Sequence, residues 1–92
     1  MKHKGTTLSV KFAKYNNGQN AILLQDIQDG QPYAVASVAL ELPLLQDEVA
    51  IKDYSENEGI LNELLHAGIV DPPHRMVSSG FVTIPICKMK RV

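Results

Sequence analysis

The chain has 92 residues, of which 45% are hydrophobic and 21% charged, and its formal net charge is −1. This size and composition predict a single globular domain, residues 1–92, and the near-neutral total charge gives no sign of a nucleic-acid binder. No apolar run approaches the roughly 20 residues that span a membrane. The alternating residues after the basic start argue against a secretory signal, and the single cysteine favours a reducing, cytoplasmic setting.

The first 40 residues predict a three-stranded antiparallel meander. Residues 7–14 alternate between apolar and polar side chains, as a half-buried strand does. Residues 21–28 are more apolar, which favours a central strand, and residues 33–40 are rich in small side chains. The connections at 16–18 and 29–30 contain Asn-Gly and Asp-Gly, which tolerate the positive φ of primed hairpin turns.

The middle of the chain predicts a loop, a short strand and one helix. A proline interrupts the apolar cluster within residues 41–48, and residues 49–54 follow as a short strand. The spacing of apolar residues in 56–67 is that of an amphipathic helix. Ser55 and Glu58 have the spacing of a capping box at the start of this helix.

The end of the helix and the last strand also have local signals. Gly68 followed by Ile69 predicts a Schellman end to the helix. After a polar loop at 74–80, residues 81–89 predict a last strand, and Pro85 within it indicates an edge position because proline cannot donate to the ladder. The fold class is therefore α+β, an antiparallel sheet of four to five strands with the helix packed on one face. Both phenylalanines, Phe12 and Phe81, are expected in the core.

Charge is segregated along the chain. Residues 1–14 carry four lysines and no acid, residues 41–63 carry seven acids and one lysine, and residues 88–92 carry three basic side chains. These charges belong either to solvated faces of unrelated elements or to a polarised surface that meets a charged partner. The candidate partner-binding residues are the acids around the helix start and the basic residues of the terminal strands: Asp53, Glu56, Glu58, Lys11, Lys14, Lys88, Lys90 and Arg91.

No residue pattern predicts catalysis, a cofactor or a metal site. Asp53, Glu56 and Glu58 lack the alternating oxygen ligands of a calcium loop, and the positive end of the helix dipole accounts for them. The three histidines and Cys87 lack zinc-ligand spacing, and Cys87 is typical of a small buried hydrophobic residue. Direct nucleic-acid contact requires that the strands with Lys11 and with the C-terminal basic residues be neighbours.

Several segments resemble a family of small bacterial proteins that are carried on plasmids and phages and whose domain has no assigned function. The segments are 51–59 (IKDYSENEG), 67–70 (AGIV) after Leu64, 79–87 (SGFV…PIC), and parts of 12–22 and 32–36. The resemblance implies an accessory protein of a mobile element, and such proteins often block host defences by binding a host complex, as anti-CRISPR proteins do. We therefore expect a non-enzymatic inhibitor of a host protein or ribonucleoprotein complex or, alternatively, a nucleic-acid-binding accessory protein of the element.

Overall fold

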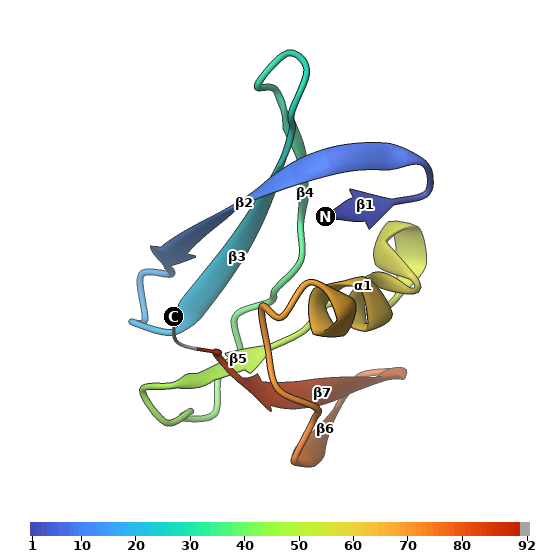
Figure 1. Ribbon diagram of the computed structural model, residues 1–92. Helices are drawn as coiled ribbons and strands as arrows, with labels where there is room; N and C mark the ends of the chain where they lie inside the picture. The colour runs from blue at the N-terminus through green and yellow to red at the C-terminus, as the bar shows by residue number, and fades with distance from the viewer. Residues whose placement is uncertain (91–92) are drawn as a thin grey trace.

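The computed structural model has the α+β fold that the sequence predicts, with an antiparallel sheet of four strands and one helix, and it adds a second sheet of three strands (Figure 1). The structure describes residues 1–90. The first sheet has the order β1-β2-β3-β4, with strands Lys2–His3 (β1), Thr6–Lys14 (β2), Asn20–Asp26 (β3) and Pro32–Val35 (β4). The second sheet has the order β5-β7-β6, with strands Glu48–Ala50 (β5), Arg75–Ser79 (β6) and Val82–Lys88 (β7). The 3-10 turn Ser55–Asn57 (η1) and the helix Ile60–His66 (α1) lie between β5 and β6.

The predicted meander is confirmed in β2, β3 and β4, although both of its turns differ from the predicted primed two-residue type. β2 and β3 pair up to Lys14 opposite Asn20. The N–H of Tyr15 then donates to the carbonyl of Gln19 at 2.8 Å, and within this connection Gly18 has a positive φ of 85°. The hairpin therefore closes with a three-residue loop and a bulge instead of a primed two-residue turn. At the second turn, the N–H of Asp26 donates to the carbonyl of Gln31 at 2.9 Å and the N–H of Gly30 to that of Asp26 at 2.8 Å, so the four residues 27–30 connect the strands.

The third strand of the meander ends earlier than predicted, because the chain crosses to the second sheet. β4 ends at Val35, and Ser37 already forms a bridge with Ile51, just beyond β5. The side-chain amide of Asn57 in η1 donates to the carbonyl of Val35 at 2.6 Å. The connection between β4 and β5 thus joins the two sheets and anchors the segment before the helix.

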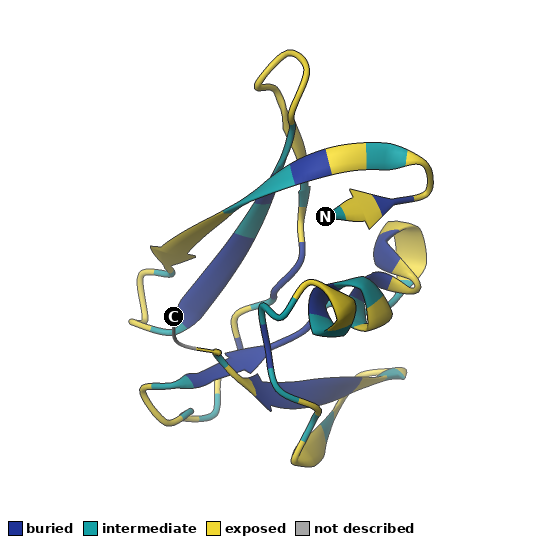
Figure 2. Cartoon of the chain, in the orientation of Figure 1, coloured by how far each residue is buried: buried dark blue, intermediate teal, exposed yellow. Residues whose placement is uncertain are grey.

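The hydrophobic core lies on both faces of the second sheet, since neighbouring strand residues point to opposite sides. Val49 and Cys87 face the first sheet and α1, whereas Ala50 and Ile86 face the segment 38–44. β5 and the middle of β7 are accordingly dark blue in Figure 2. The cluster between the sheets and the helix contains Leu8, Ile22, Leu24, Ala36, Val49, Ile51, Ile60, Leu64, Val70 and Cys87. Each fully buried Leu or Ile in it contributes about 1.5–3 kcal/mol by its removal from water.

The helix does not begin with the predicted capping box. Ser55 opens η1 with a positive φ of 55°, and no side chain caps that turn. α1 starts one turn later at Ile60, and its N-cap is Gly59, whose φ is 92°. The carboxylate of Asp53 accepts the N–H of Leu61 at 3.0 Å, so an acid before η1 satisfies a free donor of the helix start. The Ser55–Glu58 prediction is wrong because the positive-φ backbone folds η1 and α1 into separate turns.

The predicted helix end is confirmed. Gly68 has a φ of 71°, its N–H donates to the carbonyl of Leu65 at 3.1 Å, and the N–H of Ile69 donates to Leu64 at 3.0 Å. These are the two hydrogen bonds of a Schellman motif. His66 is the last residue of α1.

The last strand, β7, lies between β5 and β6, so the predicted edge position is wrong. Pro85 is accommodated because β5 ends at Ala50 and only Ile51 remains beside it. The carbonyl of Pro85 accepts the N–H of Ile51 at 3.0 Å, so the nitrogen of Pro85 also faces the β5 side and not β6. Because β5 has already ended there, no hydrogen bond within a strand pair requires an N–H at this position. The segment predicted as a polar loop contains β6, the other neighbour of β7.

Candidate interaction site

The three acids of the predicted acidic surface have different surroundings. Asp53 is half-buried and bonded to the start of α1, which leaves it a structural role. Glu56 is exposed and lies 3.0 Å from Lys52 Nζ, and the hydrogen bond from Lys52 lowers the pKa of this carboxyl. Lys4 Nζ also donates to the Glu56 carbonyl at 3.2 Å. Glu58 is exposed, so the acidic surface is reduced to a corner at η1 that lysines partly neutralise.

The predicted basic residues lie on different sheets. Lys11 and Lys14 belong to β2 of the first sheet, whereas Lys88 belongs to β7 of the second and Lys90 follows it. Arg91 lies outside the described residues. β2 and β7 are not paired with each other, so the condition for one continuous basic surface across neighbouring strands is not met.

Some of these lysines also have partners within the fold. Lys14 Nζ donates to the side-chain oxygen of Asn20 at 2.7 Å, and Lys90 Nζ lies 3.7 Å from a carboxylate oxygen of Asp71. Both lysines are exposed at the surface. Exposed contacts of this kind contribute little to stability, so both lysines are free to exchange them for a partner's groups.

The hairpin of β6 and β7 presents the most exposed aromatic side chain of the described residues. Gly80 and Phe81 form its two-residue connection, and a φ of 61° at Gly80 fits a type II′ turn. The exposed fraction of Phe81 is 109%, and that of Met76 on β6 is 56%. Figure 2 shows β6 mostly exposed beside the buried β7.

The core position expected for Phe81 is therefore wrong, because the residue lies in the turn and not in the strand. Sequence reasoning missed this hairpin because most of the residues in β6 are polar. The signal that could have found it is the Ser79-Gly80 pair, a turn dipeptide placed between Val77 and Val82.

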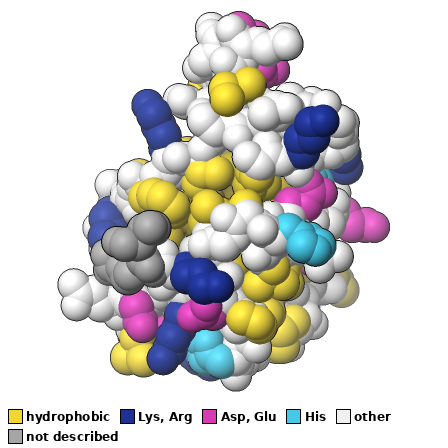
Figure 3. Space-filling view, in the orientation of Figure 1, with side chains coloured by type: hydrophobic (Ala, Val, Ile, Leu, Met, Phe, Trp, Pro, Cys, Tyr) yellow, Lys and Arg dark blue, Asp and Glu magenta, His cyan; other side chains and the backbone are white. Residues whose placement is uncertain are grey.

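Phe12 is also outside the core, with an exposed fraction of 57%. Leu8, Val10 and Phe12 share one face of β2 and pass from buried through half-buried to exposed. β1 pairs only with the first residues of β2, Thr6 and Thr7, and leaves the far end of the strand uncovered. Figure 3 shows hydrophobic side chains at the surface between the first sheet and α1.

A buried glutamate joins two strands of the second sheet. The Glu48 side chain is 2% exposed, accepts the N–H of Leu45 at 2.8 Å, and lies 3.1 Å from Arg75 Nη2 and 2.5 Å from His74 Nε2. The hydrogen bond from Arg75 is the main cause that lowers the pKa of Glu48 to about 2, and burial opposes it. All the polar partners are satisfied, so this cluster is a structural ion pair. Sequence reasoning counted Glu48 only as part of the acidic middle.

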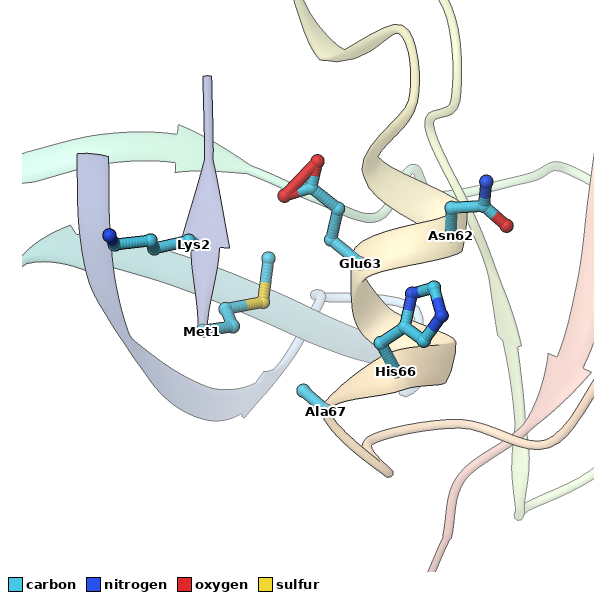
Figure 4. A pocket seen from close by; sticks show the side chains of 6 residues that line it. All are labelled: Met1, Lys2, Asn62, Glu63, His66 and Ala67. Carbon is cyan, nitrogen blue, oxygen red and sulfur yellow. The ribbon is translucent and has the colours of Figure 1, made fainter. Parts of the chain in front are cut away.

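A groove of about 490 Å³ lies between β1 and α1 (Figure 4). Glu63 points from α1 toward β1, and its carboxylate lies 3.2 Å from Nδ1 of His3, which is 2% exposed. The N-terminal amine at Met1 donates to the carbonyl of Leu8 at 2.9 Å, which fixes the wall opposite α1. The lining residues are Met1, Lys2, Asn62, Glu63, His66 and Ala67. This lining contains no hydroxyl or thiol nucleophile.

The remaining candidates for chemistry are structural. Cys87 is fully buried, and burial raises the pKa of its thiol to about 11, so the thiol stays protonated near neutral pH. Within residues 1–90, no group of three His, Cys, Asp or Glu side chains is placed to hold a metal ion. None of the helices in the same range has the length and hydropathy to cross a membrane.

Comparison of the chain with protein-family models, with curated proteins and with solved structures finds no match.

Proposed function

We propose that this chain is a non-enzymatic protein of a phage or other mobile element that binds a host RNA-guided defence complex. Binding would block the access of nucleic acid to that complex in the host cytoplasm. The proposal combines the resemblance of the sequence to small mobile-element proteins with an exposed aromatic anchor on the second sheet.

The exposed Phe81 is the observation that carries the proposal. Its turn is fixed by the positive φ of Gly80, and the base of the hairpin is held by Val77 and Val82, which pack on the second core cluster. An aromatic side chain on a defined turn loses little conformational entropy when it binds. Its burial against a partner yields about 1.5–3 kcal/mol, which is typical of the aromatic anchors at protein interfaces.

The exposed charges have a secondary role in this proposal. Glu56 and Glu58 form one acidic corner, and Lys11 and Lys88 lie on the two sheets. Charges at the rim of an interface mainly steer association and select partners. We expect them to change the association rate and its salt dependence more than the dissociation rate.

The proposal is tested in bacteria with an active RNA-guided defence system, by counting transformants of a plasmid that the system targets. Expression of the chain should raise this number, and Phe81→Ser should remove most of the gain. Truncation of an aromatic anchor costs about 2 kcal/mol or more, which is roughly 30-fold in affinity. Phe12→Ser is the matched control, because it removes an exposed phenylalanine from β2.

Binding of the purified chain to the purified effector complex gives the direct measurement, in competition with target DNA. Absence of protection and of binding across the systems tested contradicts the proposed function. Equal losses with Phe81→Ser and Phe12→Ser would instead contradict the role of the hairpin.

The alternative, a nucleic-acid-binding accessory protein, is tested with the same sample. In that case the purified chain binds DNA or RNA directly, and the affinity falls steeply as salt rises. Neutralisation of Lys11, Lys14, Lys88 and Lys90 to glutamine should then abolish the binding. If neither nucleic acid binds at low salt, the alternative is excluded.

A further inference from the structure

β6 is an outer strand of the second sheet, and its hydrogen-bonding edge points away from the molecule. The carbonyl of Pro85 accepts the N–H of Ile51 on the β5 side. Met76 lies opposite Pro85 in the pairing of β6 with β7. Since the backbone groups of Pro85 face β5, Met76 and Pro85 form a non-hydrogen-bonded pair between β6 and β7. The N–H and C=O of Met76 therefore point outward, away from β7. Hydrogen-bonded and non-hydrogen-bonded pairs alternate along an antiparallel ladder, so the N–H and C=O of Ser78, two residues later, also point outward.

The outer edge of β5 is covered by contacts within the fold, and β4 is a short strand that begins with a proline and has its last outward carbonyl occupied. On β5, the side-chain amide of Asn20 donates to the carbonyl of Glu48 at 2.8 Å, and the N–H of Val38 donates to the carbonyl of Ala50 at 3.0 Å. On β4, the side-chain amide of Asn57 donates a hydrogen bond to the outward carbonyl of Val35, the last residue of the strand. β1 has only two residues. β6 is therefore an open edge of five residues. Within residues 1–90, the part of β2 beyond its pairing with β1 is also uncovered, but it carries Lys11 and Lys14, and lysines are a usual protection against strand addition.

β6 also lacks the devices that usually prevent strand addition. Natural sheets protect their edges with proline, lysine, bulges or very short strands. β6 has five residues without proline or lysine, and it pairs with β7 without a register shift. Its one charged side chain, Arg75, is directed at the buried Glu48, and Met76 is 56% exposed. Such an edge is suited to accept another strand.

We propose that β6 pairs in antiparallel orientation with β6 of a second copy of this chain, about a two-fold axis at Val77. In this register, Met76 lies opposite the partner's Ser78 and Arg75 lies opposite the partner's Ser79, so the whole strand is paired. Met76 and Ser78 then exchange N–H and C=O hydrogen bonds with the partner. No like charges face each other, because the one charged residue of β6 lies opposite a serine. The same surface serves both copies, as a two-fold interface requires.

This assembly goes beyond the proposed function and does not depend on it. The second sheets of the two copies become one continuous sheet, and the dimer carries two hairpin turns. Phe81 lies outside the paired residues, so Phe81→Ser tests the proposed function and variants in β6 test the dimer. A contact through one short strand buries little surface, and we expect a dissociation constant between micromolar and millimolar.

The dimer is tested by sedimentation equilibrium of the full chain from micromolar to millimolar concentration. Ser78→Pro removes an outward N–H without removing a bond to β7, and it should weaken the dimer about tenfold or more. Met76→Lys adds a charge at the edge and should act in the same direction. Thr83→Lys is the matched control, since Thr83 is exposed and lies opposite Ser78 on the adjacent strand. It adds the same charge away from the edge and should leave the dissociation constant unchanged.

Amide hydrogen exchange of the unmodified chain gives a second measurement. Exchange at Met76 and Ser78 should slow as the concentration rises, while other exposed amides keep their rates. A chain that stays monomeric at millimolar concentration overturns the proposal. A dimer that survives Met76→Lys also overturns it, as does one that Thr83→Lys weakens equally. Circular dichroism shows whether each variant is folded, and if Ser78→Pro unfolds, Met76→Lys and amide exchange decide.

Discussion

Replacement of Glu48 by glutamine removes one negative charge and keeps the size and shape of the side chain. The carboxylate is buried between β5 and β6, where it accepts hydrogen bonds from Arg75, from His74 and from the N–H of Leu45. Arg75 and His74 are partly exposed, so water can solvate them in the variant. The substitution therefore measures mainly what the ionised carboxylate contributes to the free energy of unfolding.

The magnitude follows from the pKa of Glu48, which is lowered from an ordinary 4.5 to about 2, chiefly by the hydrogen bond from Arg75. At about 1.4 kcal/mol per pKa unit, the shift corresponds to about 3 kcal/mol of stability. Because the folded-state pKa is depressed, this contribution is fully present above pH 4.5 and is lost as the pH falls toward 2. Near pH 7, Glu48→Gln should lower the free energy of unfolding by about 3 kcal/mol.

Urea denaturation followed by circular dichroism, at several pH values between 7 and 2, measures this effect. The difference between Glu48→Gln and the unmodified chain should shrink steadily below pH 4.5. Glu41→Gln is the matched control, because Glu41 is exposed in the segment before β5 and should change stability by less than about 0.5 kcal/mol. A loss that is equal at pH 7 and pH 2, or no loss at pH 7, would refute the reasoning.

Four further predictions concern the helix and the thiol. Asp53→Ala should lower the free energy of unfolding by about 1 kcal/mol, because the variant loses the hydrogen bond to the start of α1. Glu58→Ala is the control and should cost less than about 0.5 kcal/mol. Equal costs of the two variants in urea denaturation would contradict this role of Asp53. Ser55→Gly should raise stability by about 0.5–1 kcal/mol because Ser55 has a positive φ, while a capping box predicts a loss. Gly68→Ala should lower the thermal midpoint through a cost of about 1 kcal/mol, since the residue has a φ of 71°. Cys87 should react with a thiol reagent near pH 8 only when denaturant is present, and rapid reaction of the folded chain would show that the thiol is accessible.

Local patterns in the sequence were sufficient for much of the fold. The alternation and turn residues of the first half predicted the meander, and the pair of Gly68 and Ile69 predicted the helix end. These features depend on residues close in sequence, whose backbone preferences act before any tertiary contact forms. Of the candidate site, the exposure of Glu56 and Glu58 followed from the same local reasoning, but their function remains a proposal.

Other features depended on contacts between distant residues. The Glu48–Arg75 pair joins residues 27 apart, and no local pattern marks which acid will be buried. Asp53 reaches the helix only because η1 turns the chain between them, and this turn needs the unusual backbone at Ser55. Phe81 is exposed because β6 and β7 form a hairpin, a pairing that the polar composition of β6 concealed.

The sequence by itself determined the α+β class, the strands of the meander and the end of the helix, since each depends on the conformational preference and periodicity of neighbouring residues. Only the tertiary structure decided the order of the second sheet, with β7 at its centre despite Pro85 and with β6 at an open edge. Strand order depends on which hydrogen-bonding groups remain unpaired after the chain has folded. For β7 it was the early end of β5 at Ala50 that made room for a proline in a central strand.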